Sequence, residues 1–406
     1  MIRSITIEGF KSISSLSAPL ELGCVNVFVG ANGSGKTNLL EAVGVLGAAA
    51  SGQVDDQALL SRGVRPGTPA LYKTSLAGPR IPRSIQISAT AKIDGRELEY
   101  RVGLDNPIDS PSAAWKYSTE SLTVESYSIL GRSAAGTRIG GQTIKPARPH
   151  VGLARLAVGM APGGDLAGSF IDTLAEYALY SLSTPVLRGT TPDPVQRDPV
   201  GLSGGRLADA LFALVRYESG KFGELDLDDV LELLDWVSEI DSVPPSRTIL
   251  SPSVPSLNRV VRFTDRYMRK NRNQLTGYDA SEGALYILFL LTLIVHPDAP
   301  RLIAIDNFDQ ALNPRLARRM MKYLSETVAA SAADKQVLLT THNPTVLDGL
   351  DIRRDDFRLF TVGRNRSGAT TVRRVTVSEE IMDAVGKGNA LSTLWVTGRL
   401  GGVPDL

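Results

Sequence analysis

The eight residues from 30 to 37, Gly-Ala-Asn-Gly-Ser-Gly-Lys-Thr, constrain this chain more than any other feature. An apolar run at residues 25–29 precedes them, and residues 38–46 follow with apolar side chains at helical spacing. A strand, a glycine-rich loop and a helix in this order are typical of a phosphate-binding loop, where backbone N–H groups and the helix N-terminus face an anion. The sequence therefore predicts an α/β fold with an ATP site.

Each position of this loop has an expected role. The glycines let the backbone approach the phosphates closely, Lys36 would reach the β and γ phosphates, and Thr37 would bind Mg²⁺. A glycine turn that contains Gly-Lys-Thr by chance is the alternative, and the flanking strand and helix argue against it. The predicted ATP-binding residues of the loop are Gly30, Asn32, Gly33, Ser34, Gly35, Lys36, Thr37 and Asn38.

Two polar residues end apolar strands in the last third of the chain. Asp306 ends a strand predicted at residues 301–306, and a carboxylate in this position would hold Mg²⁺ together with Thr37. His342 follows a strand predicted at residues 336–341, where it could sense the γ-phosphate or orient a water molecule. We therefore predict Asp306, Asn307 and His342 as catalytic residues and Thr37 and Asp306 as Mg²⁺ ligands, and we assign no role to the other histidines.

Two Ser-Gly segments could start a helix that faces the phosphate of an opposing subunit. Residues 202–206, Leu-Ser-Gly-Gly-Arg, lie far before Asp306, so we interpret them as the start of a helix at residues 207–215. Ser281 and Gly283 lie much closer to Asp306 and open the apolar stretch at residues 284–295. We therefore predict Ser281 and Gly283 as the second half of the ATP site.

The pattern of predicted elements divides the chain. A hairpin is predicted at residues 84–104, a mobile Gly-, Ala- and Ser-rich loop at residues 131–150, and mainly helices at residues 166–241. Because the predicted strands of the ATP site lie near both ends, we expect a split ATPase domain. Its predicted parts are residues 1–130 and 270–406, and residues 131–269 form a predicted inserted, largely helical lobe.

Composition limits the classes of partner. Lys and Arg total 44 against 43 Asp and Glu, so overall charge gives no reason to expect nucleic acid or an anionic membrane. The longest apolar run, residues 284–295, is shorter than the roughly 20 residues that span a bilayer. One cysteine, Cys24, and an N-terminus that alternates like a strand favour a cytoplasmic protein with no membrane partner.

With these residues placed, the chain resembles ABC-type ATPases of the RecF, SMC and OLD (overcoming lysogenization defect) group. It is similar in particular to compact OLD-like AAA ATPases of bacterial anti-phage defence systems. The resemblance is carried by Ile-Glu-Gly-Phe-Lys-Ser-Ile at residues 7–13, by residues 25–41, by Asp-Asn-Phe-Asp-Gln-Ala-Leu-Asn-Pro at residues 306–314, and by Thr341-His342. It implies an ABC-type P-loop head with a mixed sheet flanked by helices.

The resemblance also implies an assembly and a partner. Such ATPases form homodimers or higher homo-oligomers that hold ATP between subunits, and compact ones regulate a separately encoded effector, here a nuclease or a toxin. Residues 343–406 are too few for the Toprim nuclease domain of OLD proteins, so we expect no nuclease in this chain. Asn307 replaces the family's catalytic Glu, and loss of a general base costs roughly 10² to 10⁴-fold in rate. Asp309 is an alternative source of a carboxylate.

Two other functions stay open at this stage. A RecF-like, DNA-binding repair ATPase would use the basic segment at residues 247–272, although these side chains could equally pair with the acidic segment at residues 224–241. A scaffold that binds ATP and never hydrolyses it would account for Asn307.

Overall fold

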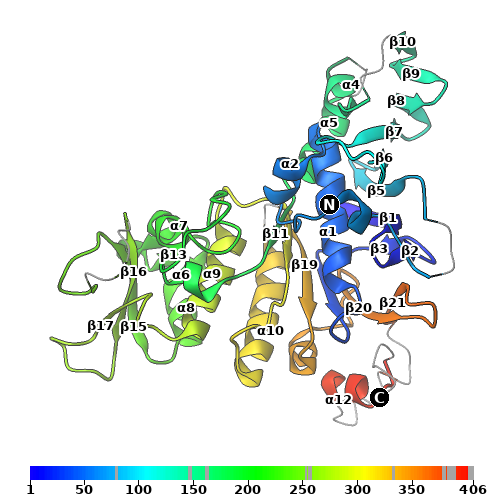
Figure 1. Cartoon of the computed structure of the whole chain (residues 1–406). Coiled ribbons are helices and arrows are strands. Elements are labelled where there is room, and N and C mark those ends of the chain that lie inside the picture. Colours follow the sequence, from blue (N-terminus) through cyan, green and yellow to red (C-terminus); the bar gives the residue numbers. More distant parts are fainter. Residues whose placement is uncertain are drawn as a thin grey trace. The chain divides into compact units, whose positions relative to one another are not determined.

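The computed structural model describes residues 1–77, 81–144, 149–160, 164–251, 254, 258–331, 334–376, 381 and 390–400 (Figure 1). The chain forms two compact units. Unit 1 comprises Met1–Leu179, Pro300–Phe308 and Val328–Leu406, and unit 2 comprises Tyr180–Ala299 and Asp309–Thr327. The inserted lobe predicted at residues 131–269 overlaps unit 2 without coinciding with it, because residues 131–179 belong to unit 1.

A nine-stranded antiparallel sheet forms one layer of unit 1, with strand order β10-β9-β8-β7-β6-β5-β1-β2 and β3 paired with β1. The hairpin predicted at residues 84–104 is confirmed as β5 and β6, whose two-residue turn places both Asp94 and Gly95 at positive φ. The strands are β1 (Ile2–Phe10), β2 (Ile13–Ser15), β3 (Leu20–Glu21), β5 (Ile85–Ile93), β6 (Arg96–Asp105), β7 (Lys116–Val124), β8 (Tyr127–Ser133), β9 (Gly136–Ile139) and β10 (Gln142–Ile144).

The prediction of a mobile loop at residues 131–150 is wrong for most of the described residues in this range. Strands β8, β9 and β10 continue the sheet, and only residues 145–148 lie outside the described residues. The Gly and Ser content suggested a loop, but Leu130 and Ile139 are register partners and both are buried. Pairing with a neighbouring strand, which local composition does not encode, decides the structure here.

A six-stranded sheet forms the second layer of unit 1, in the order β11-β18-β19-β4-β20-β21. Strands β18, β19, β4 and β20 are parallel to their neighbours in this group, and β21 runs antiparallel to β20. The strands predicted at residues 25–29, 301–306 and 336–341 are confirmed as β4, β18 and β19. The bounds are β11 (Ala178–Tyr180), β18 (Leu302–Ile305), β19 (Gln336–Thr341), β4 (Val25–Val29), β20 (Phe357–Arg364) and β21 (Thr370–Arg374).

Helix α1 (Lys36–Ser51) fills the core between these sheets and contacts β1, β5 and β19 (Figure 1). Nearly all of its side chains are buried, and its neighbours approach closely. A Cβ on Gly44 would lie 2.4 Å from Val64, and one on Gly47 would lie 2.5 Å from the Leu174 carbonyl oxygen, so α1 depends on glycine at both positions. The other helices of unit 1 are α2 (Asp56–Leu60), α3 (Pro69–Tyr72), α4 (Ala154–Met160), α5 (Gly164–Ala175), η2 (Pro344–Gly349) and α12 (Leu391–Val396).

Unit 2 combines helices with two three-stranded antiparallel sheets, so the prediction of mainly helices at residues 166–241 is only partly correct. Residues from 237 form a strand, because the basic segment supplies a pairing partner along its length. The elements are α6 (Thr184–Leu187), α7 (Leu207–Leu214), β12 (Val215–Arg216), η1 (Tyr217–Ser219), β13 (Lys221–Phe222), β14 (Leu225–Asp226), α8 (Leu227–Leu233), β15 (Val237–Val243), β16 (Val260–Asp265), β17 (Gln274–Thr276) and α9 (Glu282–Val295). Helix α10 (Pro314–Ala330) begins in unit 2 and ends in unit 1.

None of the helices within the described ranges is both long and apolar enough to cross a membrane.

Candidate nucleotide site

The predicted phosphate-binding loop connects β4 to α1, as its flanking sequence requires. Gly33 and Gly35 have φ angles of 75° and 107°, a region that favours glycine. Gly30 has a different constraint, because a Cβ there would lie 2.1 Å from the Val362 carbonyl oxygen. A Cβ on Gly35 would also lie 2.1 Å from the Thr370 hydroxyl oxygen. The three glycines are therefore required by backbone conformation, by close approach, or by both.

Two side chains of the loop are suited to a bound phosphate. Lys36 is buried, and its ammonium Nζ donates hydrogen bonds to the carbonyl oxygens of Gly30 (2.7 Å) and Ala31 (2.9 Å). The Ser34 hydroxyl is buried and has no hydrogen-bond partner among the described residues. A buried hydroxyl without a partner is unfavourable, and an oxygen of a phosphate would satisfy it. Asn32 and Gly33 are exposed.

A directed chain of hydrogen bonds holds the loop from behind. Asn38 Nδ2 donates to the Ser12 hydroxyl (2.7 Å), which lies 2.7 Å from the Thr370 hydroxyl, and Thr370 donates to the Ser34 carbonyl oxygen (2.9 Å). Each hydroxyl has one proton, and Thr370 donates its proton to Ser34. The Ser12 hydroxyl must therefore donate to Thr370. Arg364, at the end of β20, donates from Nε to the Gly33 carbonyl oxygen (2.7 Å). The last two strands of the sheet therefore position the loop.

The structure brings two of the predicted residues together across 269 positions of sequence. The Thr37 hydroxyl donates to the Asp306 carboxylate at 2.8 Å, and the Thr340 hydroxyl bonds the other carboxylate oxygen. Hydroxyl and carboxylate oxygens are ligands that Mg²⁺ prefers, so this pair fits the predicted metal. Within the described ranges no group of three or more His, Cys, Asp or Glu side chains could hold a metal ion. Phosphate oxygens and water would complete the coordination of Mg²⁺.

Asn307 and His342 follow the ends of adjacent strands. Asn307 has a positive φ of 54°, which Asn tolerates better than most residues, and its N–H donates to the Thr340 hydroxyl at 2.9 Å. His342 follows β19 directly, and its side chain is exposed. The catalytic roles of Asp306, Asn307 and His342 stay predictions.

Ser281 and Gly283 lie at the N-terminus of α9, in unit 2. The Ser281 hydroxyl is the N-cap and accepts a hydrogen bond from the Ala284 N–H at 3.3 Å, while the side chain itself is exposed. From residue 284 to 295 every side chain of this helix is buried, so the helix is firmly held. These residues and the phosphate-binding loop belong to different units, and their joint role stays a prediction.

The Ser-Gly segment at residues 202–206 already binds a carboxylate of its own chain. The Asp193 carboxylate accepts hydrogen bonds from the N–H groups of Ser203 (3.1 Å), Gly205 (3.0 Å) and Val195 (3.0 Å). Helix α7 then begins at Leu207, as predicted. A phosphate would have to displace a buried carboxylate to bind here, so the geometry does not favour this segment as a second half-site.

A buried ion cluster beside the loop was missed by the sequence analysis. Glu41 lies one helical turn after Thr37, is fully buried, and accepts hydrogen bonds from Lys11 Nζ (2.5 Å) and from Arg65 Nε (2.7 Å). Burial alone would raise the pKa of the Glu41 carboxyl, but its hydrogen bonds and charge contacts with Arg65 and Lys11 outweigh burial and lower that pKa. Bonding to Glu41 raises the pKa of Arg65, burial opposes this, and Asp306 adds to the increase.

We predict that Glu41→Gln destabilises unit 1. The change leaves Lys11 and Arg65 without a countercharge, and we expect a loss of about 2 kcal/mol in the free energy of unfolding at neutral pH, measured by urea denaturation. Because the folded-state pKa is lowered, the stabilisation is present above the ordinary pKa of a carboxyl group. It is lost as the pH falls through the lowered pKa, so the difference between wild type and variant should shrink in acid.

Glu99→Gln is the matched control, because Glu99 pairs with an exposed arginine, Arg101, at 2.7 Å. We expect it to change stability by less than about 1 kcal/mol. Equal losses in the two variants would contradict a special role for the buried cluster.

Comparison with solved structures places this fold in a known class. The chain is similar to an SMC head solved in complex with the C-terminal winged-helix domain of ScpA, with a TM-score of 0.53 and 14% identity over 94% of this chain and 99% of the other. It is also similar to an SMC head domain with an extended coiled coil, solved with the C-terminal domain of ScpA derived from Pyrococcus furiosus, with a TM-score of 0.52 and 12% identity over 95% and 98% of the two chains. These likenesses show the fold, which is that of an ABC-type P-loop ATPase head.

The family follows from the sequence. The profile of the family described as "AAA domain, putative AbiEii toxin, Type IV TA system" matches residues 25–127 and 224–348, more than half of the chain. The chain belongs to this family of AAA ATPase domains. Both matched stretches contain motif residues, with residues 30–38 in the first and Ser281, Asp306 and His342 in the second.

A short stretch is also similar to a DNA repair protein. The chain is 43% identical over 61 residues to the DNA replication and repair protein RecF of Streptomyces avermitilis, and 43% identical over 61 residues to that of Beutenbergia cavernae. The match spans 15% of this chain and 16% and 15% of those relatives. RecF similarity is therefore shown for a segment and not for the whole length.

Proposed function

We propose that this protein is an ATP-binding, slowly hydrolysing ABC-type ATPase that dimerises around ATP and regulates a separately encoded effector. The observation that carries the proposal is the pair formed by Thr37 and Asp306 (2.8 Å), which joins the phosphate-binding loop to the end of β18. Family membership and the SMC-head fold support ATPase activity of this type. A role in bacterial anti-phage defence, with a nuclease or toxin as effector, belongs to the same proposal and rests on the resemblance to OLD-like ATPases.

Within the proposed site each residue has a distinct task. Lys36 exchanges its loop carbonyl contacts for the β and γ phosphates, and the Ser34 hydroxyl donates to a phosphate oxygen. Thr37 and Asp306 would hold Mg²⁺, which neutralises charge on the phosphates when bound. The exposed hydroxyl of Ser281, with the N–H groups at the start of α9, is available to the ATP of a second subunit.

Asn307 determines the rate in this proposal. An amide can orient water by hydrogen bonding, but it cannot accept the proton that the attacking water loses. The backbone bond from Asn307 to Thr340 holds the residue directly after the Asp306 carboxylate, where the family has its glutamate. In the proposed protein ATP therefore stays bound for a long time, and the ATP-bound dimer is the state that regulates the effector. A scaffold that never hydrolyses ATP is the limiting case of the same chemistry.

We predict that Lys36→Ala abolishes ATP binding, because the variant lacks the positive charge that would contact the phosphates. Ser281→Arg should leave ATP binding intact and prevent ATP-dependent dimerisation, because the side chain would block the approach of a second nucleotide. Calorimetry measures binding, and light scattering during size-exclusion chromatography measures dimerisation. Ser203→Arg is the control for the second variant, since Asp193 already occupies that segment. Wild-type behaviour of both Lys36→Ala and Ser281→Arg would refute the proposed site.

We predict that Asn307→Glu raises the steady-state rate of phosphate release by roughly 10² to 10⁴-fold, because it restores a general base. Asn307→Gln is the matched control and should stay slow, since it adds length without a basic group. If Asn307→Glu is no faster than wild type, another group already accepts the proton, and Asp309 is then the first candidate to replace.

Nucleic-acid binding is a second candidate function, favoured by the short RecF match and by one loop of unit 2. Three of the seven basic residues at positions 247–272 are occupied internally: Arg259 by Ser242, Arg262 by Asp241 and Arg266 by the Val237 carbonyl. The loop between β16 and β17 differs. Tyr267 is 78% exposed there, and the side chains of Arg269, Lys270 and Arg272 are exposed and form no hydrogen bond or ion pair with any described residue.

We predict that replacing Arg269, Lys270 and Arg272 by Ala weakens any binding to duplex DNA and reduces its dependence on salt. Fluorescence anisotropy with a labelled duplex, between low and physiological salt, measures both. A triple replacement of Arg138, Arg155 and Arg353 by Ala, all exposed and outside this loop, is the matched control. If wild type does not bind the duplex at low salt, this second candidate is excluded.

A further inference from the structure

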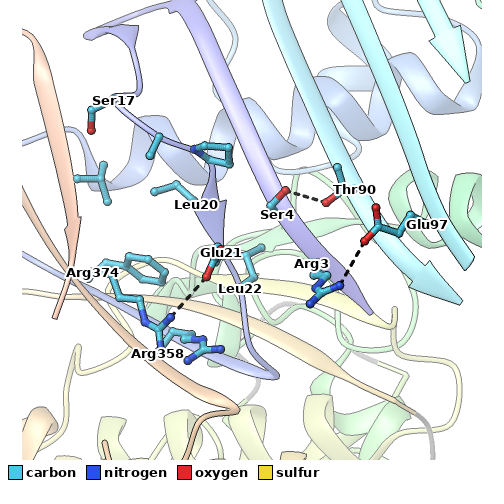
Figure 2. A pocket seen from close by; sticks show the side chains of 14 residues that line it. Arg3, Ser4, Ser17, Leu20, Glu21, Leu22, Thr90, Glu97, Arg358 and Arg374 are labelled. Carbon is cyan, nitrogen blue, oxygen red and sulfur yellow. Dashed lines mark hydrogen bonds and ion pairs between the residues drawn. The ribbon is translucent and has the colours of Figure 1, made fainter. Parts of the chain in front are cut away.

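A cleft of about 630 Å³ lies in unit 1 among residues of β1, β3, β20 and β21 (Figure 2). One side is formed by β1 and by the segment leading into β3, and the other by β20 and β21. Arg3, Leu20, Leu22, Arg358, Phe360 and Arg374 are among the residues that line it. Its volume falls within the range of about 300 to 1,000 Å³ that is common for sites of small ligands.

Two arginines in this cleft converge on one point. Arg358 and Arg374 both approach the same carboxylate oxygen of Asp355, at 3.2 Å and 3.7 Å, and Asp355 is fully exposed. Arg374 also lies 3.6 Å from the exposed Glu21, and Figure 2 marks this ion pair with a dashed line. Ion pairs whose carboxylates are exposed contribute little at such distances, so a ligand anion can replace Asp355 and Glu21. Arg358 Nε is buried and has no hydrogen-bond partner among the described residues, so its internal bonds do not hold this guanidinium fully.

The inner wall of the cleft is apolar. Leu20, Leu22, Phe360 and Val372 are buried residues that face it, and the nearby hydroxyls of Ser4 and Thr90 bond each other at 2.7 Å. The arginines and this wall together select a ligand with a charged group at one end and an apolar body at the other. We propose that the cleft binds an amphipathic organic anion, such as a carboxylate or sulfonate with a hydrocarbon part.

The strands that line the cleft also hold the phosphate-binding loop. Arg358 and Phe360 belong to β20, whose last residue, Arg364, donates to the Gly33 carbonyl oxygen. Arg374 ends β21, whose first residue, Thr370, donates to the Ser34 carbonyl oxygen. At about 3.3 Å per residue, Arg358 in the cleft and Arg364 at the loop lie roughly 20 Å apart along β20. An anion that shifts this hairpin changes the support of the loop, so the proposal includes coupling between the two sites, and this part rests on the proposed ATP site.

Binding is tested first without nucleotide, by fluorescence titration with 8-anilinonaphthalene-1-sulfonate. We expect saturable binding at one site, and roughly tenfold weaker binding in Arg358→Gln and in Arg374→Gln, because each removes a charged hydrogen-bond donor. Arg101→Gln, outside the cleft and paired with Glu99, should bind like wild type. Equal affinity in wild type and in both cleft variants would overturn the proposal.

Competition on wild-type protein keeps the test independent of any folding defect in the variants. Decanoate should displace the probe, whereas decyltrimethylammonium, with a hydrocarbon chain of nearly the same length and the opposite charge, should not. Displacement by both to the same extent would show a merely apolar surface and overturn the proposal.

Coupling is tested by measuring the affinity for a fluorescent ATP analogue with and without saturating decanoate. We expect a change of roughly fivefold or more in wild type, reached at roughly tenfold higher decanoate in Arg374→Gln, and ATP should change the affinity of wild type for decanoate by the same factor. Anion binding with unchanged nucleotide affinity would overturn the coupling. Absent nucleotide binding in wild type would instead refute the proposed ATP site, and the result of the first titration would still stand.

Discussion

The pairing of β4 with two strands from the far end of the chain is the constraint on which the rest of unit 1 depends. β4 lies between β19 and β20 and is parallel to both, and each of its five residues is buried. This arrangement places the loop after β4 next to the residues that follow β18 and β19. Without it Thr37 and Asp306 would have no reason to meet, and α1 would lose one of the two sheets that it separates.

The sequence predicted the parts of the site that local chemistry encodes. The loop, its helix and the three buried strands have strong local signals, because glycine spacing and short apolar runs leave few alternatives. The supports of the loop have no such signal. Thr370 and Arg364 are ordinary polar residues on strands, and only the pairing of β20 with β4 brings them near the loop.

The same limit explains what was missed or wrong. In the sequence, Lys11 and Ser12 were part of a family motif and had no predicted role. In the structure, Lys11 bonds Glu41, and Ser12 belongs to the hydrogen-bond chain that supports the loop. Residues 131–150 were expected to be a loop because they are rich in Gly, Ala, Ser and Arg, and pairing with the neighbouring strand overrides that composition over residues 131–144. Ser203 and Ser281 show the converse. The Ser203 N–H donates to the Asp193 carboxylate, whereas the Ser281 hydroxyl caps its own helix, and nothing in either short segment predicts this difference.

The separation of Thr37 and Asp306 along the chain also has a consequence for how the protein is made. During synthesis the loop and α1 leave the ribosome long before β18, β19 and β20. Strand β4 therefore has neither of its two neighbouring strands, β19 and β20, until the end of the chain is made. Contacts between residues so distant in sequence form slowly, since a long loop has to close first. The exposed apolar strand is a natural target for chaperones in that interval. A truncated translation product that ends before β18 would therefore contain the whole phosphate-binding loop without the strands that position it.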